Sequence, residues 1–118
     1  MAESSVLSTH VLNVAQGVPA EGVSVELWRL GPAEELVVRT ATGADGRANG
    51  ALLPAAGFVP GRYELRFGVG EYFLRRALGA DPPFHDVVSV RVFLAEGQGH
   101  YHVPLLCSPW SYTTYRGS

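Results

Sequence analysis

The sequence contains very little cysteine and no long apolar run. Cys107 is its single cysteine, so no disulfide can form within the chain. This excludes a small secreted scaffold held together by disulfides and favours a reducing compartment. No apolar run reaches the length that a membrane-spanning helix requires. The first residues also lack the basic and apolar regions of a secretory leader, so we expect a cytoplasmic protein that is not bound to a membrane.

Charged residues are scarce as well. They make up 17% of the 118 residues, the formal net charge is −2, and no basic block or stripe is present. A nucleic acid is therefore not expected as a partner. Apolar residues make up 47%, which excludes a disordered chain. We expect residues 1–118 to form one domain, long enough to enclose a hydrophobic core.

What the chain does contain is a series of short segments in which apolar and polar residues alternate. Turn residues such as glycine, proline and aspartate separate these segments. One short helix is predicted at about residues 71–78, with Gly70 as a cap and Gly79 just after its end. This pattern predicts an all-β protein, a mostly antiparallel β-sandwich or small barrel. The predicted strands cover residues 8–14, 23–30, 36–40, 62–69, 88–94, 100–107 and 112–115.

Two histidines lie on apolar strand faces at opposite ends of the chain. His10 shares a face with Leu12, and His102 shares a face with Leu106. Each histidine alone is typical of a hydrogen-bonded side chain at the rim of a core. If the terminal strands pair, however, both imidazoles face one pocket. Imidazole is the natural acid or base for activating water near neutral pH.

An arginine follows a strong turn signal in the middle of the chain. Asp45-Gly46 is typical of a tight hairpin turn, and Arg47 comes directly after it. Arg47 is either a solvated turn residue or a guanidinium that holds a planar anionic ligand through two hydrogen bonds. Arg116, near the end of the chain, has the same two interpretations.

Several other chemistries are not supported by the sequence. His100-x-His102 lacks a third ligand at a familiar spacing, and His100 is expected to be exposed, so we predict no metal site. Cys107 lies five positions after His102 and therefore on the opposite strand face, which makes it a buried apolar residue and not a nucleophile. His85 is expected in a loop. Neither a Gly-x-Ser-x-Gly elbow nor a phosphate-binding glycine loop is present, and no cofactor is expected.

Five short motifs resemble one known family, in the same order and over essentially the whole chain. That family is the 5-hydroxyisourate hydrolases, transthyretin-like enzymes of urate breakdown. The chain-terminal Tyr-Arg-Gly-Ser is the most specific of the motifs. They are Leu-Ser-Thr-His-Val-Leu-Asn at residues 7–13, Gly-Val-Pro-Ala at 17–20, Asp-Gly-Arg at 45–47, Tyr-His-Val-Pro-Leu-Leu at 101–106 followed by Ser-Pro at 108–109, and Tyr-Arg-Gly-Ser at 115–118.

The resemblance implies a fold, an assembly and a set of site residues. The fold would be a transthyretin-like β-sandwich of two four-stranded sheets with one short helix. The assembly would be a homotetramer with active sites in a channel at the dimer–dimer interface. Asn13 departs from the usual aspartate of the family and is expected to affect packing or turn geometry. The implied catalytic residues are His10, Arg47, His102 and Ser118, and the implied substrate-binding residues are these four with Tyr115, Arg116 and Gly117.

The resemblance also implies a reaction. A histidine would help water to attack a ring amide of 5-hydroxyisourate, giving 2-oxo-4-hydroxy-4-carboxy-5-ureidoimidazoline, which makes the protein a cyclic amide hydrolase. The sequence does not say which histidine is the base. The alternative is a transthyretin-like protein that binds small hydrophobic ligands in the same channel without catalysis. Such a carrier has no need of His10, Arg47 and His102 together.

Overall fold

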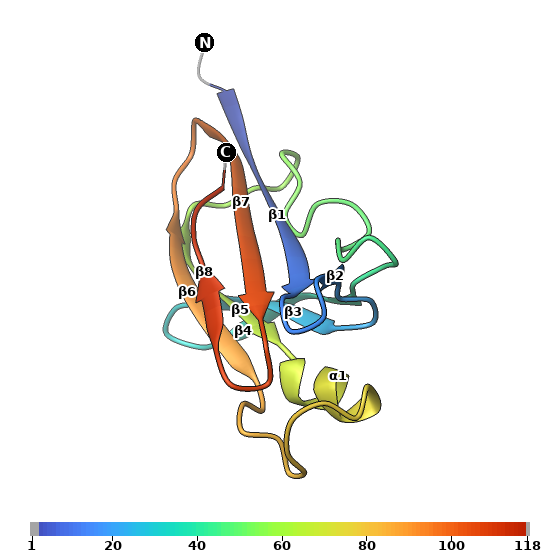
Figure 1. Cartoon of the computed structure of the whole chain (residues 1–118). Coiled ribbons are helices and arrows are strands. Elements are labelled where there is room, and N and C mark those ends of the chain that lie inside the picture. Colours follow the sequence, from blue (N-terminus) through green and yellow to red (C-terminus); the bar gives the residue numbers. More distant parts are fainter. Residues whose placement is uncertain (1–2, 118) are drawn as a thin grey trace.

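The computed structural model describes residues 3–117 and shows a β-sandwich (Figure 1). Within these residues two four-stranded sheets pack against each other, one with the strand order β2-β1-β7-β8 and the other with the order β4-β3-β5-β6. The predicted fold class is therefore confirmed. The elements are β1 (Glu3–Asn13), β2 (Val18–Pro19), β3 (Ser24–Leu30), β4 (Glu35–Ala41), β5 (Gly61–Phe67), α1 (Val69–Arg75), β6 (Val88–Leu94), β7 (Gln98–Cys107) and β8 (Tyr112–Thr114).

The strands β1 and β7 lie side by side in the same direction (Figure 1). This pair is parallel, whereas the other strand pairs within the described residues are antiparallel. Leu7 and Val11 of β1 are fully buried between the sheets, while Ser8, His10 and His102 lie half-buried on the outer face. This confirms both the pairing of terminal segments and the strand faces expected for the histidines.

The core fills the space between the inner faces of the two sheets. Its largest fully buried side chains include Tyr63, Phe67 and Leu105 from the strands and Tyr72 and Phe73 from α1. Asn13, which is also fully buried, donates from Nδ2 to Gln16 Oε1 at 2.9 Å and accepts from the Gln16 N–H at 3.1 Å. It therefore shapes the turn after β1, as expected from its position.

The buried thiol of Cys107 behaves as the sequence predicts. Its side chain is fully buried, and this burial raises the pKa of the thiol to about 11. The thiol therefore stays protonated at neutral pH, because a thiolate would lose its hydration in this position. Cys107 is a small core residue and not a nucleophile.

The helix α1 differs from its predicted boundaries of residues 71–78. It runs from Val69 to Arg75, and Ala77 ends it by adopting a φ of 55°. Gly70 lies inside the helix, where a Cβ atom would approach the His85 carbonyl oxygen to 2.6 Å. Gly70 is thus a packing glycine inside the helix and not its cap, and Gly68 is the N-cap instead. Gly79 was expected just after the helix, but Ala77 takes the left-handed conformation directly after the C-cap Arg76. Over residues 3–117, the structure contains no helix that is long and apolar enough to span a membrane.

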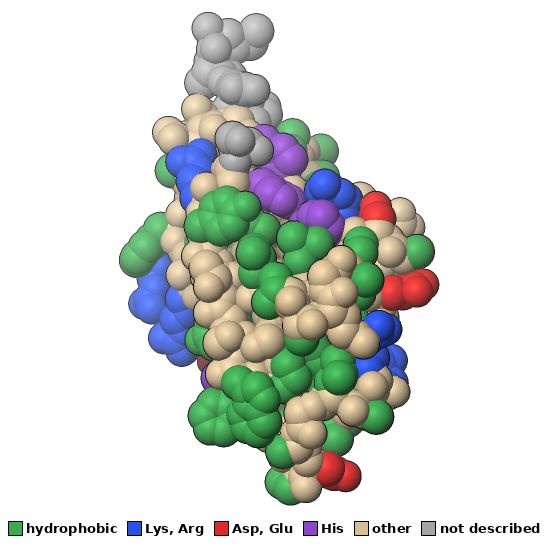
Figure 2. Space-filling model, in the orientation of Figure 1, with side chains coloured by type: hydrophobic (Ala, Val, Ile, Leu, Met, Phe, Trp, Pro, Cys, Tyr) green, Lys and Arg blue, Asp and Glu red, His purple; other side chains and the backbone are tan. Residues whose placement is uncertain are grey.

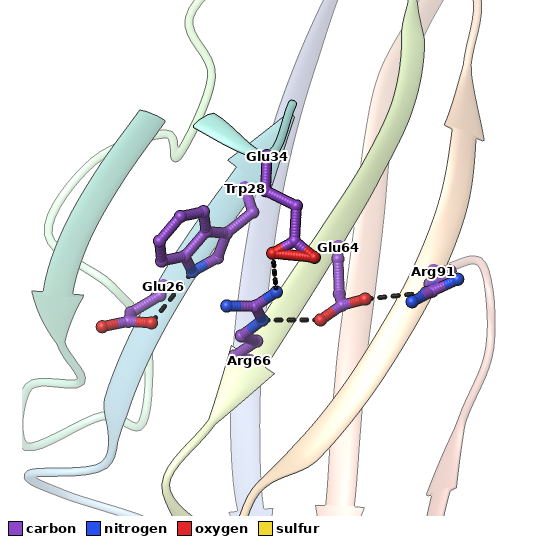
Figure 3. Close-up of polar contacts among 6 residues, drawn as sticks. All are labelled: Glu26, Trp28, Glu34, Glu64, Arg66 and Arg91. Atoms are coloured by element: carbon purple, nitrogen blue, oxygen red, sulfur yellow. Dashed lines mark hydrogen bonds and ion pairs between the residues drawn. The ribbon is translucent and has the colours of Figure 1, made fainter. Parts of the chain in front are cut away.

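A network of charged side chains covers the outer face of the sheet β4-β3-β5-β6 (Figure 3). Glu64, a residue that is 4% exposed, accepts through its carboxylate from Arg66 Nε at 2.6 Å and from Arg91 Nε at 2.7 Å. The hydrogen bond from Arg66, aided by Arg91 and opposed by burial, lowers the pKa of the Glu64 carboxyl group. Arg66 also pairs with Glu34 at 2.9 Å and lies 4.4 Å from the centroid of the Trp28 ring. The network therefore links β3, β5 and β6.

Replacing Glu64 by glutamine should lower the free energy of unfolding at pH 7 by about 1–3 kcal/mol, because two partly exposed guanidinium groups lose the charge of their buried partner. The pKa of Glu64 is lower in the folded chain than in the unfolded chain. The stabilisation is therefore present above the unfolded value, 4.5, and is lost as the pH falls through the folded value. The difference between wild type and Glu64→Gln should accordingly narrow in acid, as measured by urea unfolding at a series of pH values.

The matched control is Glu35→Gln, because the ion pair between Arg29 and Glu35 is 3.5 Å long and the Glu35 side chain is 68% exposed. Exposed pairs contribute little, so this variant should unfold almost like wild type. Equal destabilisation by both substitutions would contradict the buried role of Glu64.

Candidate functional site

The outer face of the sheet β2-β1-β7-β8 carries a patch of histidine side chains beside a Lys or Arg side chain (Figure 2). The parallel register places Ser8 opposite His102 and His10 opposite Pro104. His10 and His102 are therefore diagonal neighbours on one face, two residues apart along the paired strands. The structure thus brings the two predicted histidines together.

A backbone carbonyl fixes the proton of His10. His10 Nε2 lies 2.7 Å from the Asp45 carbonyl oxygen. A carbonyl oxygen only accepts, so Nε2 carries the proton and donates it. In the neutral ring the unshared electron pair is therefore on Nδ1. The same Asp45 accepts the Arg47 N–H through Oδ1 at 2.9 Å, which couples the two predicted residues.

The turn before Arg47 needs a glycine. Gly46 adopts a φ of 80°, and a Cβ atom there would overlap the Val11 carbonyl oxygen and approach His10 Cδ2 to 3.1 Å. The Val11 N–H donates to the Gly46 carbonyl oxygen at 2.8 Å, and Arg47 forms an isolated antiparallel bridge with His10. The predicted Asp45-Gly46 turn therefore holds the exposed Arg47 directly across from His10.

Burial and nearby positive charge both act on His102. Loss of hydration lowers the pKa of the His102 imidazole most, and electrostatic interactions with Arg47, His100 and His10 lower it further. Each of these effects disfavours the protonated ring. His102 is therefore a neutral imidazole at neutral pH, able to take up a proton.

A serine holds the His102 ring in place. Ser8 Oγ lies 2.9 Å from His102 Nδ1 and 2.6 Å from His100 Nε2. His100 is exposed, as expected, yet it is joined to the site through Ser8. The sequence did not identify Ser8 or His100 as site residues. The alternation of strand faces could have indicated them, because each lies two positions before a predicted histidine and therefore on the same face.

The C-terminal segment reaches the same site at Gly117. Its N–H donates to the His102 carbonyl oxygen at 2.7 Å. A Cβ atom at Gly117 would lie 2.9 Å from His102 Cδ2, so the tail backbone packs directly against the ring. Tyr115 and Arg116 instead line a neighbouring groove of about 350 Å³ between β6 and the segment after β8. Ser118, which was also predicted as a site residue, lies outside the described residues.

The described residues provide acid–base and anion-holding groups. Between Glu3 and Gly117, no three His, Cys, Asp or Glu side chains are grouped in a way that could hold a metal ion. The neutral imidazole of His102 can accept a proton, His10 Nδ1 can accept a hydrogen bond, and the Arg47 guanidinium can stabilise developing negative charge. Together these groups can activate a water molecule for attack on a carbonyl carbon.

Residues 7–117 match the model of the HIUase/transthyretin family. The chain belongs to this family. One relative, named 5-hydroxyisourate hydrolase 2 and found in Rhizobium meliloti (strain 1021), is 48% identical over 122 residues, and the match covers 100% of both chains. The family resemblance of the five motifs is thereby confirmed over the full length.

Solved structures of the HIUase/transthyretin family have the same fold. The structure of Klebsiella pneumoniae 5-hydroxyisourate hydrolase is 36% identical, with a TM-score of 0.82 over 97% of this chain and 99% of that one. The structure of sea bream transthyretin in complex with thyroxine is 28% identical, with a TM-score of 0.85 over 94% of this chain and 93% of that one. The sandwich is therefore transthyretin-like.

Replacing Gly117 by alanine should push the tail away from His102. The ring then becomes more hydrated, and the pKa of His102 should rise towards the ordinary histidine value of about 6.5, because burial is the largest cause that lowers it. A proton NMR titration of the His102 ring measures this shift. In the control, Gly31→Ala, the new Cβ meets nothing closer than 3.8 Å, so the titration should not change. An unchanged midpoint in Gly117→Ala would show that the tail does not shield the ring.

Proposed function

We propose that the protein is a 5-hydroxyisourate hydrolase, which opens a ring amide of its substrate to give 2-oxo-4-hydroxy-4-carboxy-5-ureidoimidazoline. The observation that carries this proposal is the convergence of His10, Arg47 and His102 on one face, with His102 kept neutral. The hydrolase name of the Rhizobium relative at 48% identity supports the same function.

In this mechanism His102 is the general base. Its imidazole takes a proton from water while the water oxygen bonds to the amide carbonyl carbon. His10 Nδ1 accepts a hydrogen bond from the same water and so orients it. The Arg47 guanidinium holds the planar substrate and stabilises the oxyanion. The carbon–nitrogen bond then breaks, and the leaving nitrogen takes the proton that His102 received, so the neutral ring is restored.

Catalysis is favoured over simple ligand carriage. A carrier of hydrophobic molecules gains nothing from a cationic arginine and two imidazoles on an otherwise apolar channel wall. The transthyretin whose structure holds thyroxine is 28% identical to this chain, whereas the hydrolases from Klebsiella and Rhizobium are 36% and 48% identical. The charged side chains and the higher identity to hydrolases both support hydrolysis over ligand carriage.

The proposal includes a homotetramer in the cytoplasm, with active sites at the dimer–dimer interface. The site lies on an outer sheet face, where another subunit can form the opposite wall. Leu12 and Leu106 are half-buried on this face, and Val14 and Val18 beside it are 50% and 37% exposed. Apolar surface of this kind favours coverage by a second subunit.

The tail is proposed as the substrate-binding wall of this site. The direct contact between Gly117 and His102 supports its position. Arg116 lies 4.3 Å from the centroid of the Tyr101 ring, next to Tyr115 in the neighbouring groove. These two residues and Ser118 are proposed to bind substrate in the assembled protein.

Replacing His102 or His10 by glutamine should lower kcat/KM by about 10²–10⁴-fold, because general base assistance or water orientation is lost. The substrate can be generated with urate oxidase and its decay followed by ultraviolet absorbance, with and without micromolar protein. His85→Gln is the matched control, since His85 packs in a loop between Phe84 and Tyr112 and should leave turnover unchanged. Wild-type protein that fails to accelerate the decay would refute the hydrolase assignment, and full turnover in both site variants would refute the roles of these histidines.

Replacing Arg47 by glutamine should change the pH dependence as well as the rate. The positive charge of Arg47 lowers the pKa of His102, so its removal raises that pKa. The base then becomes protonated at a higher pH, and the acid limb of the kcat/KM profile should move upward in pH. The control is Arg39→Gln, which lies on the other sheet and should leave the pH of the acid limb unchanged. An acid limb that stays where it is in Arg47→Gln would contradict the coupling.

A further inference from the structure

The Ser8 hydroxyl lies between two imidazole rings that belong to the neighbouring strand. Ser8 is opposite His102 in the β1–β7 register, so the sheet backbone itself sets the position of the hydroxyl. Its distances to His102 Nδ1 and His100 Nε2 are 2.9 Å and 2.6 Å. Both are within hydrogen-bonding distance, the second being short for a nitrogen–oxygen pair, and the two ring centroids are 6.0 Å apart.

The number of protons limits how these hydrogen bonds run. A hydroxyl has one proton to donate and can also accept, whereas a neutral imidazole has one protonated and one unprotonated nitrogen. Ser8 can donate to one of the two rings at most, although its oxygen can accept from both. His102 Nδ1–H therefore donates to Ser8, with His100 either accepting from the hydroxyl or donating to it as well, or Ser8 donates to His102 Nδ1 while His100 Nε2–H donates to Ser8. The direction decides which nitrogen of His102 is free to act.

We propose that Ser8 is a positioning residue for His102: its hydroxyl accepts the proton of His102 Nδ1, donates to His100 Nε2, and so leaves His102 Nε2 unprotonated and turned to the substrate. The direction rests on the proposed function, because a general base needs a free electron pair on the nitrogen that meets the water. Ser8 thus does for His102 what the Asp45 carbonyl does for His10, with the opposite nitrogen fixed.

A hydroxyl suits this position electrostatically. Three side chains act on the charge of His102: Arg47, which follows the Asp45-Gly46 turn, His10 from β1 and His100 from β7. Gly117 of the tail contributes backbone only. A carboxylate beside Nδ1 would also orient the ring, but its negative charge would stabilise the imidazolium ion. The neutral hydroxyl orients the ring and leaves it uncharged.

The tautomer of His102 tests the proposal without any substrate. In the folded full-length chain labelled with ¹⁵N-histidine, the His102 signals are assigned by their loss in His102→Gln. We expect wild type to show a protonated Nδ1 and a free Nε2. Ser8→Ala should shift the ring to the Nε2–H form that histidine prefers in water, and Ser8→Thr, which keeps a hydroxyl, should retain the wild-type form. An Nε2–H ring in wild type, or no change in Ser8→Ala, would overturn the proposal. The wild-type measurement decides the direction even if a variant fails to fold.

Turnover provides a second readout. Ser8→Ala should lower kcat by about 10–100-fold, the loss typical of residues that orient a functional imidazole, with little change in KM. Ser8→Thr should recover most of kcat, because the hydroxyl returns. Equal loss in the two variants at an unchanged urea midpoint would overturn the positioning role. If wild type itself fails to hydrolyse 5-hydroxyisourate, the proposed function falls, while the tautomer measurement still decides the role of Ser8.

Discussion

The parallel pairing of β1 with β7 is the constraint on which the site depends. It places a strand from the beginning of the chain beside one from the end, so Ser8, His10 and His102 share a face. Their neighbours Leu7 and Val11 face the core from the same strand. A slip of the register by one residue would turn every side chain of β1 to the other face and bury polar groups in the core. The apolar residues of β1 therefore fix the geometry of the site.

The two sheets use charge in opposite ways on their outer faces. On one face Glu64 lies between Arg66 and Arg91, and opposite charges lower its pKa and stabilise the fold. On the other face burial lowers the pKa of His102 most, and Arg47 lowers it further without a compensating carboxylate among the groups that shift this pKa, so the imidazole is neutral at neutral pH. The first arrangement stabilises the folded chain. The second leaves the His102 imidazole uncharged at neutral pH, which is the form that the proposed function requires.

Much of the fold and part of the site could be predicted from the sequence, because both follow from local patterns. Strand alternation predicted that His10 shares a face with Leu12, but the role of Gly70 depended on the close approach of a distant loop that no local pattern shows. Ser8 and His100 looked ordinary until the register of β1 and β7 placed them together. The contact of Gly117 with the site depends on a single isolated bridge, which strand propensity does not indicate.

The order in which the chain is synthesised gives this topology a further consequence. Ser8 and His102 are 94 positions apart, so β1 leaves the ribosome long before its partner strand exists. Contacts between such distant segments carry a large loop-closure entropy and form late in folding. Until then β1 is an apolar strand with an unpaired edge, which is the kind of segment that aggregates in partly folded chains. A nascent or truncated chain without β7 therefore lacks the arrangement of Ser8, His10 and His102, which exists only after β1 and β7 have paired.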